Sequence, residues 1–289
     1  MSELAVPKPG LGVWLMAARP RTLSAGVSPV LVGTAIAHGV GAFRPLAALL
    51  ALLASLLIQI GTNFANDYSD FKHGADANRV GPPRVTQSGL IAPATVKLAA
   101  WIAFGASGIL GIALAAMAGW PILVIGAASV AAGWLYTGGP WPLGYHGLGD
   151  LFTFVFFGLV ATCGTVYAQA LYVPPIAWQA ATAVGALATA ILVVNNLRDR
   201  ETDARVGKNT LAVKLGARAT RAQYVILVMV PFALAIAIGA PWTLLALAAV
   251  VPALRTVLAK DGAALNLGLG QTARAQLIYS ILLAVQLWR

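Results

Sequence analysis

Charged residues are scarce in this chain of 289 residues: Asp, Glu, Lys and Arg make up 10%, against about 25% in an ordinary globular domain. None occurs between Lys97 and Asp150, or between Asp150 and Arg198. Hydrophobic types account for 59% of the residues, and the mean hydropathy is +0.81. So much uncharged surface could not stay dissolved in water, which excludes a soluble globular fold. We therefore predict an all-α polytopic membrane protein.

Cysteine is almost absent: with Cys163 alone, the chain can form no intrachain disulfide. The 19 Lys and Arg residues against 9 acids would suggest a nucleic-acid partner in a soluble protein. In a membrane protein the same excess reflects basic loops held in the cytoplasm, so we expect no nucleic-acid partner. Residues 1–10 lack the basic and then apolar layout of a cleaved signal peptide, which predicts that the first span is an uncleaved anchor.

Apolar runs separated by Gly, Pro and charged residues predict about nine membrane spans, several close to the roughly 20 residues that cross a bilayer core. Shorter spans need protein neighbours or a thinned bilayer. We expect one transmembrane domain over residues 1–289, with motif loops at about 66–93 and 195–221. The predicted spans are 20–38, 45–65, 96–117, 120–136, 150–171, 175–196, 222–239, 241–258 and 272–288.

The charges are distributed unequally between the two sides of the membrane that these spans define. Every Lys and Arg except Arg44 and Arg289 falls on the side of the N-terminus. This asymmetry predicts a multi-pass protein of the cell membrane whose N-terminus and motif loops are cytoplasmic. All the acids fall on the same side, which the positive-inside rule does not require. The second asymmetry therefore calls for a separate, functional cause.

Six of the nine acids lie in two short clusters, at 63–76 and 195–203, where the second and sixth predicted spans end. If each span continues as a helix, residues four apart share a face. Four spans separate the clusters, an even number, so both clusters open on the same side of the membrane and can face each other. The residues that would share a face are Asn66 with Asp70, and Asn195 with Asp199 and Asp203.

Carboxylates that approach one another repel unless a cation lies between them. Oxygen ligands without a set of His and Cys favour a hard divalent ion, Mg²⁺, which keeps part of its shell for waters and substrate phosphates. Basic residues nearby would supply phosphate contacts, and the predicted ones are Lys72, Arg79, Arg84, Arg198 and Lys208. The pattern predicts a site for a lipid diphosphate at the membrane surface. Ordinary loops, in which acids pair locally with Lys and Arg, are the alternative.

At these residues the chain resembles the UbiA-type intramembrane prenyltransferases, which carry an Asn-x-x-x-Asp motif after the second helix and an Asp-x-x-x-Asp motif after the sixth. The strings that carry the resemblance are Ala18–Leu23, Asn66–Asp70, Gly81–Gly89 and Asn195–Leu211. The segment from Arg84 to Gly89 points to the naphthoate branch of the family. The resemblance implies about nine helices around a central cavity that opens laterally to lipid under a cytoplasmic cap.

The activity that the resemblance implies is a Mg²⁺-dependent transfer of a polyprenyl group from polyprenyl diphosphate to 1,4-dihydroxy-2-naphthoate. Loss of CO₂ would then give demethylmenaquinone. The resemblance places Asn66, Asp70, Asp199 and Asp203 at positions that serve Mg²⁺ and diphosphate, and turnover is expected to depend on Asp70 and Asp199. Three further residues lie near this set: Asp67, Asp76 and Asn195. Many relatives have an acid where this chain has Gly74, so Asp76, two residues later, departs from the usual spacing.

The allylic cation formed in such a reaction must be kept from water and is attracted by aromatic faces. Tyr136, at the end of the fourth predicted span, is the preferred aromatic residue for this role. The other candidates are Phe64, Tyr68, Trp134 and Tyr145. For the aromatic substrate, we predict that Arg21 binds the carboxylate, with Arg19 extending to the interface, and that Gln87 contacts a ring hydroxyl.

Two kinds of alternative function remain open at this point. Within the enzyme class, the acceptor could be 4-hydroxybenzoate, homogentisate or haem, although the string from Arg84 to Gly89 weighs against them. From another class, a secondary transporter would also bury ionisable residues, but near the bilayer midplane and often in inverted halves. The sequence specifies neither the length of the prenyl chain nor the oligomeric state.

Overall fold

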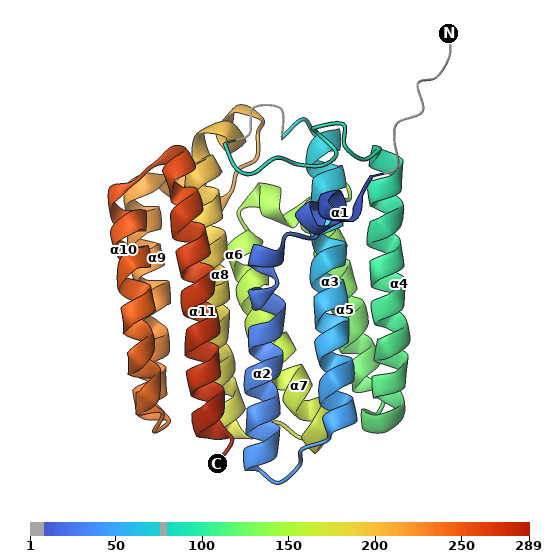
Figure 1. Cartoon of the computed structure of the whole chain (residues 1–289), viewed down its shortest axis with the longest axis vertical. Helices are drawn as coiled ribbons and strands as arrows, with labels where there is room; N and C mark the ends of the chain where they lie inside the picture. Colours follow the sequence, from blue (N-terminus) through green and yellow to red (C-terminus); the bar gives the residue numbers. More distant parts are fainter. Residues whose placement is uncertain (1–8, 76–79) are drawn as a thin grey trace.

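The computed structural model describes residues 9–75 and 80–289, and these residues form helices and connecting turns without any strand. The long helices run side by side along the long axis of the molecule (Figure 1). The predicted all-α class is confirmed. The α-helices are α1 (Leu11–Ala18), α2 (Ser24–Gly39), α3 (Pro45–Lys72), α4 (Pro93–Ala118), α5 (Pro121–Leu135), α6 (Gly149–Phe154), α7 (Ala161–Ala170), α8 (Pro175–Arg205), α9 (Leu211–Ala237), α10 (Leu247–Ala259) and α11 (Leu265–Leu287).

Short 3₁₀ segments interrupt or connect these helices, and a π-helical segment, η3 (Val155–Val160), joins α6 to α7. The 3₁₀ segments are η1 (Pro20–Thr22), η2 (Leu143–His146), η4 (Pro241–Ala246) and η5 (Gly262–Ala264). Proline occupies the first turn of α3, α4, α5 and α8, where its missing N–H costs no hydrogen bond. The starts of these four helices are therefore indicated by the local sequence.

Each predicted span overlaps helical residues, and six helical segments among the described residues are long and apolar enough to cross a membrane. Two shorter helices, α2 with 16 residues and α5 with 15, fall below the roughly 20 residues of a full span. The integral membrane class is confirmed, while the number of nine spans stays a prediction. The six segments are α3, α4, Gly149–Ala170, α8, α9 and Pro241–Ala259.

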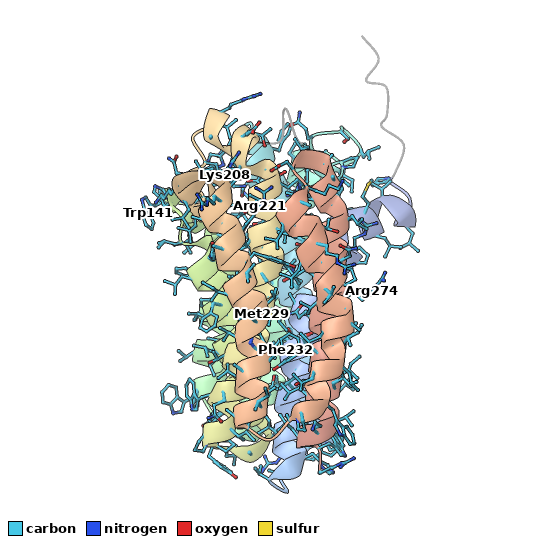
Figure 2. The ribbon with its side chains drawn as sticks, turned by 90° about the vertical axis from the view of Figure 1, so that its left-hand side faces the viewer. Trp141, Lys208, Arg221, Met229, Phe232 and Arg274 are labelled. Atoms are coloured by element: carbon cyan, nitrogen blue, oxygen red, sulfur yellow. The ribbon has the colours of Figure 1, made fainter. Side chains whose placement is uncertain are left out.

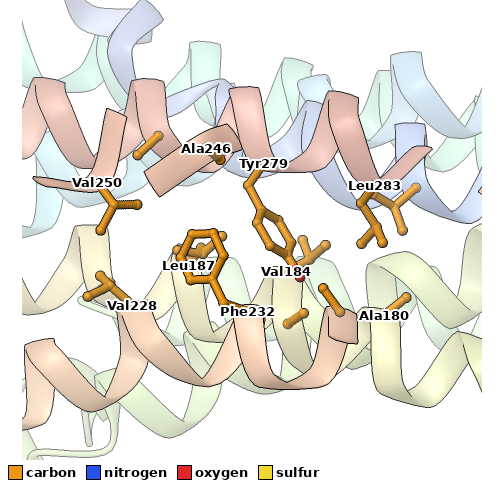
Figure 3. Close-up of a cluster of buried hydrophobic side chains, with 14 of the residues drawn as sticks. Ala180, Val184, Leu187, Val228, Phe232, Ala246, Val250, Tyr279 and Leu283 are labelled. Carbon is orange, nitrogen blue, oxygen red and sulfur yellow. The ribbon is translucent and has the colours of Figure 1, made fainter. Parts of the chain in front are cut away.

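Helix α8 lies at the centre of the most tightly packed part of the bundle, against α9 and α11. Figure 3 shows this core, in which Ala180, Val184 and Leu187 of α8 face Phe232 and Tyr279. Alanine is frequent on α8, and small side chains let helices approach closely in lipid. At Gly158 and Gly185 the approach is closest, since a Cβ added to Gly158 would lie 2.6 Å from the Cα of Gly185.

A cavity of about 1040 Å³ occupies the other part of the bundle, with walls from α3, α4, α5, the α6–α7 segment and α8. Several of its lining residues are also strongly exposed on the outer surface, among them Trp101 and Ile109 of α4 and Leu123 of α5. Gly105 and Gly108 line the same wall, and a Cβ at either would meet no atom within 4 Å. The cavity therefore reaches the outer surface of the bundle on the side of α4 and α5.

Candidate functional site

The two motif-bearing helices, α3 and α8, end at the same end of the bundle, at the top in Figure 1. Both continue beyond the predicted span ends at 65 and 196, so the motif residues are helical. Residues four apart in each motif therefore share a face, as the spacing predicts. The turn after α8 carries Lys208, which Figure 2 shows near this end, well above Met229 and Phe232. Polar side chains from both motifs thus meet over the cavity.

Lys208 connects the two motifs. Its Nζ lies 3.6 Å from Oδ1 of Asp70 and 3.8 Å from Oδ1 of Asp203. The same ammonium lies 5.2 Å from the ring centre of Tyr145, within range of a cation–π contact. A single cation therefore contacts carboxylates from two helices that are far apart in the sequence. The opposition of carboxylates that the motifs predict is present in the fold.

Asp70 is a buried acid of the site, and its side chain is 3% exposed. The hydroxyl of Tyr145 donates a hydrogen bond to Oδ1 at 3.0 Å. Nη2 of Arg84 lies 3.8 Å from Oδ2. With Lys208, two cations and one hydroxyl surround this buried side chain, so its oxygens have polar partners despite their burial.

Asp67 and Asn66, adjacent in α3, have different surroundings. The two carboxylate oxygens of Asp67 accept backbone hydrogen bonds from Val85 and Thr86, at 3.3 and 3.1 Å. Asp67 thereby anchors the loop that carries Arg84, and it does not line the cavity. Asn66 lines the cavity, and its Oδ1 accepts a hydrogen bond from the Thr137 hydroxyl at 2.7 Å. In this structure both oxygens of Asp67 are engaged by that loop, and its predicted part in metal binding stays a prediction.

In the second motif, Arg198 forms a buried two-pronged ion pair with Asp199, at 2.8 and 2.6 Å. Arg198 also donates to Oδ1 of Asn195 and to Oδ1 of Asn266 in α11, each at 2.8 Å. Such fork-shaped pairing fixes both partners. In this arrangement Arg198 connects α8 to α11 and orients Asp199 and Asn195, and its predicted contact with the diphosphate stays a prediction.

The predicted site residues divide by position. Those that line the cavity are Asn66, Asp70, Arg84, Tyr136, Asn195 and Lys208. Lys72, Gln87 and Arg21 are exposed and lie outside the lining. Asp76 and Arg79 lie outside the described residues. The cavity wall thus gathers Asp70, the amides of Asn66 and Asn195, two bases and the preferred aromatic residue, but Arg21 and Gln87 do not line it.

Arg19 lines the cavity where the sequence favoured its neighbour Arg21. The backbone of Arg19 is left-handed, with φ of 53°, and this break between α1 and η1 turns the side chain inward. Its Nη2 donates to the backbone oxygen of Asn63 at 3.2 Å. Asn63 in turn donates to the Thr22 hydroxyl and to the oxygen of Ala18. A guanidinium is therefore fixed at the cavity wall by a network within α3 and η1.

Aromatic side chains line the cavity below the polar end. Tyr136 follows α5, and a Cβ at Gly149 would lie 2.7 Å from its hydroxyl oxygen, so glycine leaves room for this ring. Phe152 and Phe156 stack with ring centres 5.9 Å apart, and both line the cavity. Sequence reasoning missed this pair although the two residues are four apart, because helical spacing does not show which face of an apolar helix borders a cavity.

The donor set fits a divalent cation whose shell is completed by a ligand. Within the described residues, no three His, Cys, Asp or Glu side chains lie close enough to form a complete metal cage. Mg²⁺ is usually held by one or two carboxylates together with water and phosphate oxygens, so a partial oxygen set is what it requires. Asp70 and Asp203 already share one cation, the ammonium of Lys208, and Asn66 lies one helical turn before Asp70. These residues fit Mg²⁺.

The chain is similar in sequence to proteins of known name. The 1,4-dihydroxy-2-naphthoate octaprenyltransferase of Mycobacterium tuberculosis is 44% identical over 244 residues, covering 84% of each chain. The Escherichia coli protein of the same name is 43% identical over 75% of this chain and 72% of its own length.

Solved structures show the same fold. A UbiA homolog from Archaeoglobus fulgidus bound to GPP and Mg²⁺ matches with a TM-score of 0.62 at 14% identity, over 94% of this chain and 99% of that chain. A UbiA homolog from Aeropyrum pernix in its apo form matches with a TM-score of 0.69 at 14% identity, over 91% and 97%. The model of the UbiA prenyltransferase family matches residues 26–261. With its two acidic motifs meeting over an apolar cavity, this chain belongs to the UbiA prenyltransferase family.

Proposed function

We propose that this protein transfers a polyprenyl group from polyprenyl diphosphate to 1,4-dihydroxy-2-naphthoate, as the relatives at 40–44% identity are named for doing. The observation that carries the proposal is the contact of Asp70 and Asp203 with one ammonium, directly over an apolar cavity open to lipid. This arrangement suits a ligand with a charged head and a long apolar tail. The reaction would continue with loss of CO₂ from the naphthoate and give demethylmenaquinone.

Asn66, Asp70 and Asp203 are the residues that would hold Mg²⁺, with Asp199 close by in α8. The ion supplies neutralisation of negative charge on the diphosphate when it is bound. Asp199 is paired with Arg198, so it can bind Mg²⁺ only if that ion pair opens. With the pair closed, Asp199 would instead act by holding Arg198, which contacts Asn195 and Asn266 of α11. Asp67 stays outside the proposed ligand set because its carboxylate already binds the backbone of Val85 and Thr86.

Lys208 and Arg84 would bind the diphosphate directly. Both line the cavity and both contact Asp70, so each lies between the acids and the apolar chamber. Charged hydrogen bonds to phosphate oxygens are the strong kind, and they stabilise the charge that grows on the leaving group. Lys208 would move from the carboxylates to the diphosphate when Mg²⁺ neutralises those carboxylates.

The cavity below would hold the isoprenoid chain and keep the reacting carbon from water. Tyr136 and the stacked pair Phe152 and Phe156 offer aromatic faces on its walls. Aromatic faces attract a cation electrostatically, and exclusion of water prevents its capture as an alcohol. The opening beside α4 and α5 would let the distal isoprene units extend into lipid.

For the aromatic acceptor, we propose Arg19 as the residue that binds the carboxylate. Arg19 lines the cavity whereas Arg21 is exposed. A guanidinium binds a carboxylate through two parallel hydrogen bonds, which would also orient the ring.

We further propose that all 289 residues form one transmembrane domain in the bacterial plasma membrane, with about nine spans. The motif end would be cytoplasmic, because almost all the Lys and Arg gather there. The loop that follows α3 and the turn that follows α8 would cap the cavity on that side.

The function is tested by incubating the purified protein in lipid nanodiscs with Mg²⁺, a labelled polyprenyl diphosphate and, separately, 1,4-dihydroxy-2-naphthoate, 4-hydroxybenzoate and homogentisate. We expect a prenylated, decarboxylated product with the naphthoate alone, and none after chelation of the metal. Product with only 4-hydroxybenzoate would overturn the proposed acceptor, and consumption of diphosphate with no acceptor product would overturn the transfer itself.

A further inference from the structure

A buried carboxylate beside the cavity has no part in the function proposed above. Asp150 lies in the first turn of α6, and it is 8% exposed. Within the part of the chain that the structure describes, no Lys or Arg forms an ion pair with it. Burying a carboxylate without a cation is costly, so an acid in such a place needs a function that offsets this cost.

Two side-chain amides from two other helices donate hydrogen bonds to the carboxylate of Asp150. Nδ2 of Asn196, in α8, donates to Oδ1 at 3.4 Å. Nε2 of Gln223, in α9, donates to Oδ2 at 2.6 Å. Asp150 does not line the cavity, but Asn196 does, in the same wall as Leu192 one turn before it. Asp150 therefore lies behind Asn196 as seen from the cavity.

This placement fixes which atom of the Asn196 amide is available to a ligand. A primary amide donates through nitrogen and accepts through oxygen. Because the nitrogen is held on Asp150, outside the lining, the carbonyl oxygen is the amide atom left for a ligand in the cavity. Within the described residues no protein hydrogen bond occupies that oxygen. The wall of the cavity thus carries an oriented hydrogen-bond acceptor.

An oriented acceptor selects among the chemical groups that enter the cavity. Diphosphate oxygens are themselves acceptors and would be repelled by a carbonyl oxygen, and an isoprenoid chain has no donor. A ring hydroxyl is the donor that matches it, and the proposed aromatic acceptor carries two. We infer that Asn196 accepts a hydrogen bond from a ring hydroxyl of the aromatic substrate, and that Asp150 is a positioning residue that fixes Asn196 for this contact. The inference rests on the proposed function for the identity of its ligand.

Because the Gln223 side chain can turn over, a conservative replacement of Asp150 can separate the orientation of Asn196 from the negative charge of the carboxylate. Oε1 of Gln223 is buried without a hydrogen-bond partner. In the variant Asp150→Asn, the new amide oxygen can still accept from Asn196, and the new amide nitrogen can donate to Gln223 once that side chain turns over. Asp150→Leu has a similar volume but accepts nothing. The two variants therefore differ in whether Asn196 is held.

The kinetic test compares Asp150→Asn, Asp150→Leu and Asn196→Ala with Glu201→Gln as a control, since Glu201 is exposed beside the second motif. We expect Asp150→Leu and Asn196→Ala to raise the KM for dihydroxynaphthoate about 10-fold, and to leave the KM for polyprenyl diphosphate within about twofold. Asp150→Asn should stay within about threefold of the wild type in both constants. Equal impairment by Asp150→Asn and Asp150→Leu would overturn the positioning role, as would a parallel rise in the KM for the diphosphate.

A second measurement carries the test if Asp150→Leu does not fold. Two competitive inhibitors, 1-hydroxy-2-naphthoate and 4-hydroxy-2-naphthoate, each lack one ring hydroxyl. Asn196→Ala should weaken the inhibitor that keeps the paired hydroxyl about 10-fold and leave the other unchanged. Equal weakening of both inhibitors, or of neither, would overturn the inference. Failure of the proposed function is recognised separately, because the wild-type protein would then form no product from dihydroxynaphthoate.

Discussion

Helices α4 and α8 are similarly apolar, with mean hydropathies of 2.0 and 1.7 over their most apolar windows, yet the bundle uses them differently. The window of α8 is 72% buried in protein and that of α4 only 28%. Helix α8 packs against neighbours around most of its circumference, whereas α4 separates an internal cavity from lipid. Hydropathy alone therefore shows that a helix avoids water, but not whether its surroundings are protein, lipid or a ligand.

Glycine shows the same contrast at the level of single residues. Gly158 and Gly185 are needed because two backbones touch there. Gly105 and Gly108 face open space, where a side chain would meet nothing. In the packed region glycine permits contact between helices, and in the cavity wall it leaves room for a ligand. Substitutions in the two regions should accordingly affect different measured quantities.

The largest expected effect is the loss of turnover when an acid of the cavity end is removed. Asp70→Ala should lower kcat/KM about 1000-fold or more, because it removes the carboxylate shared by Lys208, Arg84 and the proposed cation. Because Lys208 and the buried Arg84 also lose a partner, circular dichroism in detergent must show that the variant is folded before its turnover is compared. Near-normal turnover in this variant would contradict the proposed metal site, and Glu201→Gln serves as its matched acid control.

A substitution where α8 packs against Gly158 should lower the stability of the protein rather than its turnover. Gly185→Leu places a Cβ 2.9 Å from both the Cα of Gly158 and the backbone oxygen of Phe154, so the helices must separate. We expect a destabilisation of about 3 kcal/mol or more. Chemical denaturation followed by tryptophan fluorescence measures it, with Gly108→Leu as the glycine control. Equal stability of the two variants would remove the contrast between the regions.

The control variant Gly108→Leu also tests the role of the cavity wall. Gly108→Leu should fold normally but fill part of the space beside α4. The variant should therefore lower kcat/KM more for long prenyl donors than for short ones. We expect kcat/KM for an octaprenyl donor to fall about 10-fold relative to that for a geranyl donor. Competition between the two labelled diphosphates gives the ratio directly. An unchanged ratio would mean that the chain does not pass this wall.

The smallest effect should come from a buried hydrogen bond in the packed core. The hydroxyl of Tyr279 donates to the backbone oxygen of Pro231 at 2.7 Å, inside the cluster of Figure 3. Tyr279→Phe should reduce the free energy of unfolding by about 1 kcal/mol and leave prenyl transfer unchanged. A variant with normal stability but reduced turnover would show that the packed region communicates with the site.

The fold class and the two motifs could be read from the sequence because they depend on local periodicity. A four-residue spacing on a helix fixes which side chains share a face, and this held at Asn66 and Asp70 once α3 continued to Lys72. The partners of the motif residues could not be read in this way. The pairing of Arg198 with Asp199 and the binding of Asp67 to the backbone of Val85 are set by tertiary packing.

Local backbone departures account for other differences. Arg19 has a left-handed backbone, and its side chain lines the cavity whereas that of Arg21 does not. Phe156 lies in the π-helical segment and lines the wall. Neither break has a sequence signal as strong as a proline or a run of charge. The roles of individual site residues stay predictions until they are tested in the protein.

The central claim is that Asp70 and Asp203 act on one shared cation and its bound diphosphate. A double-mutant cycle tests it most directly, with the Kd of an unreactive farnesyl thiodiphosphate measured at saturating Mg²⁺ for the wild type, Asp70→Asn, Asp203→Asn and the double variant. Each single variant should weaken binding at least about 10-fold, and the double variant should bind no more weakly than the weaker single. If the two losses multiply as independent effects, the carboxylates do not share a cation.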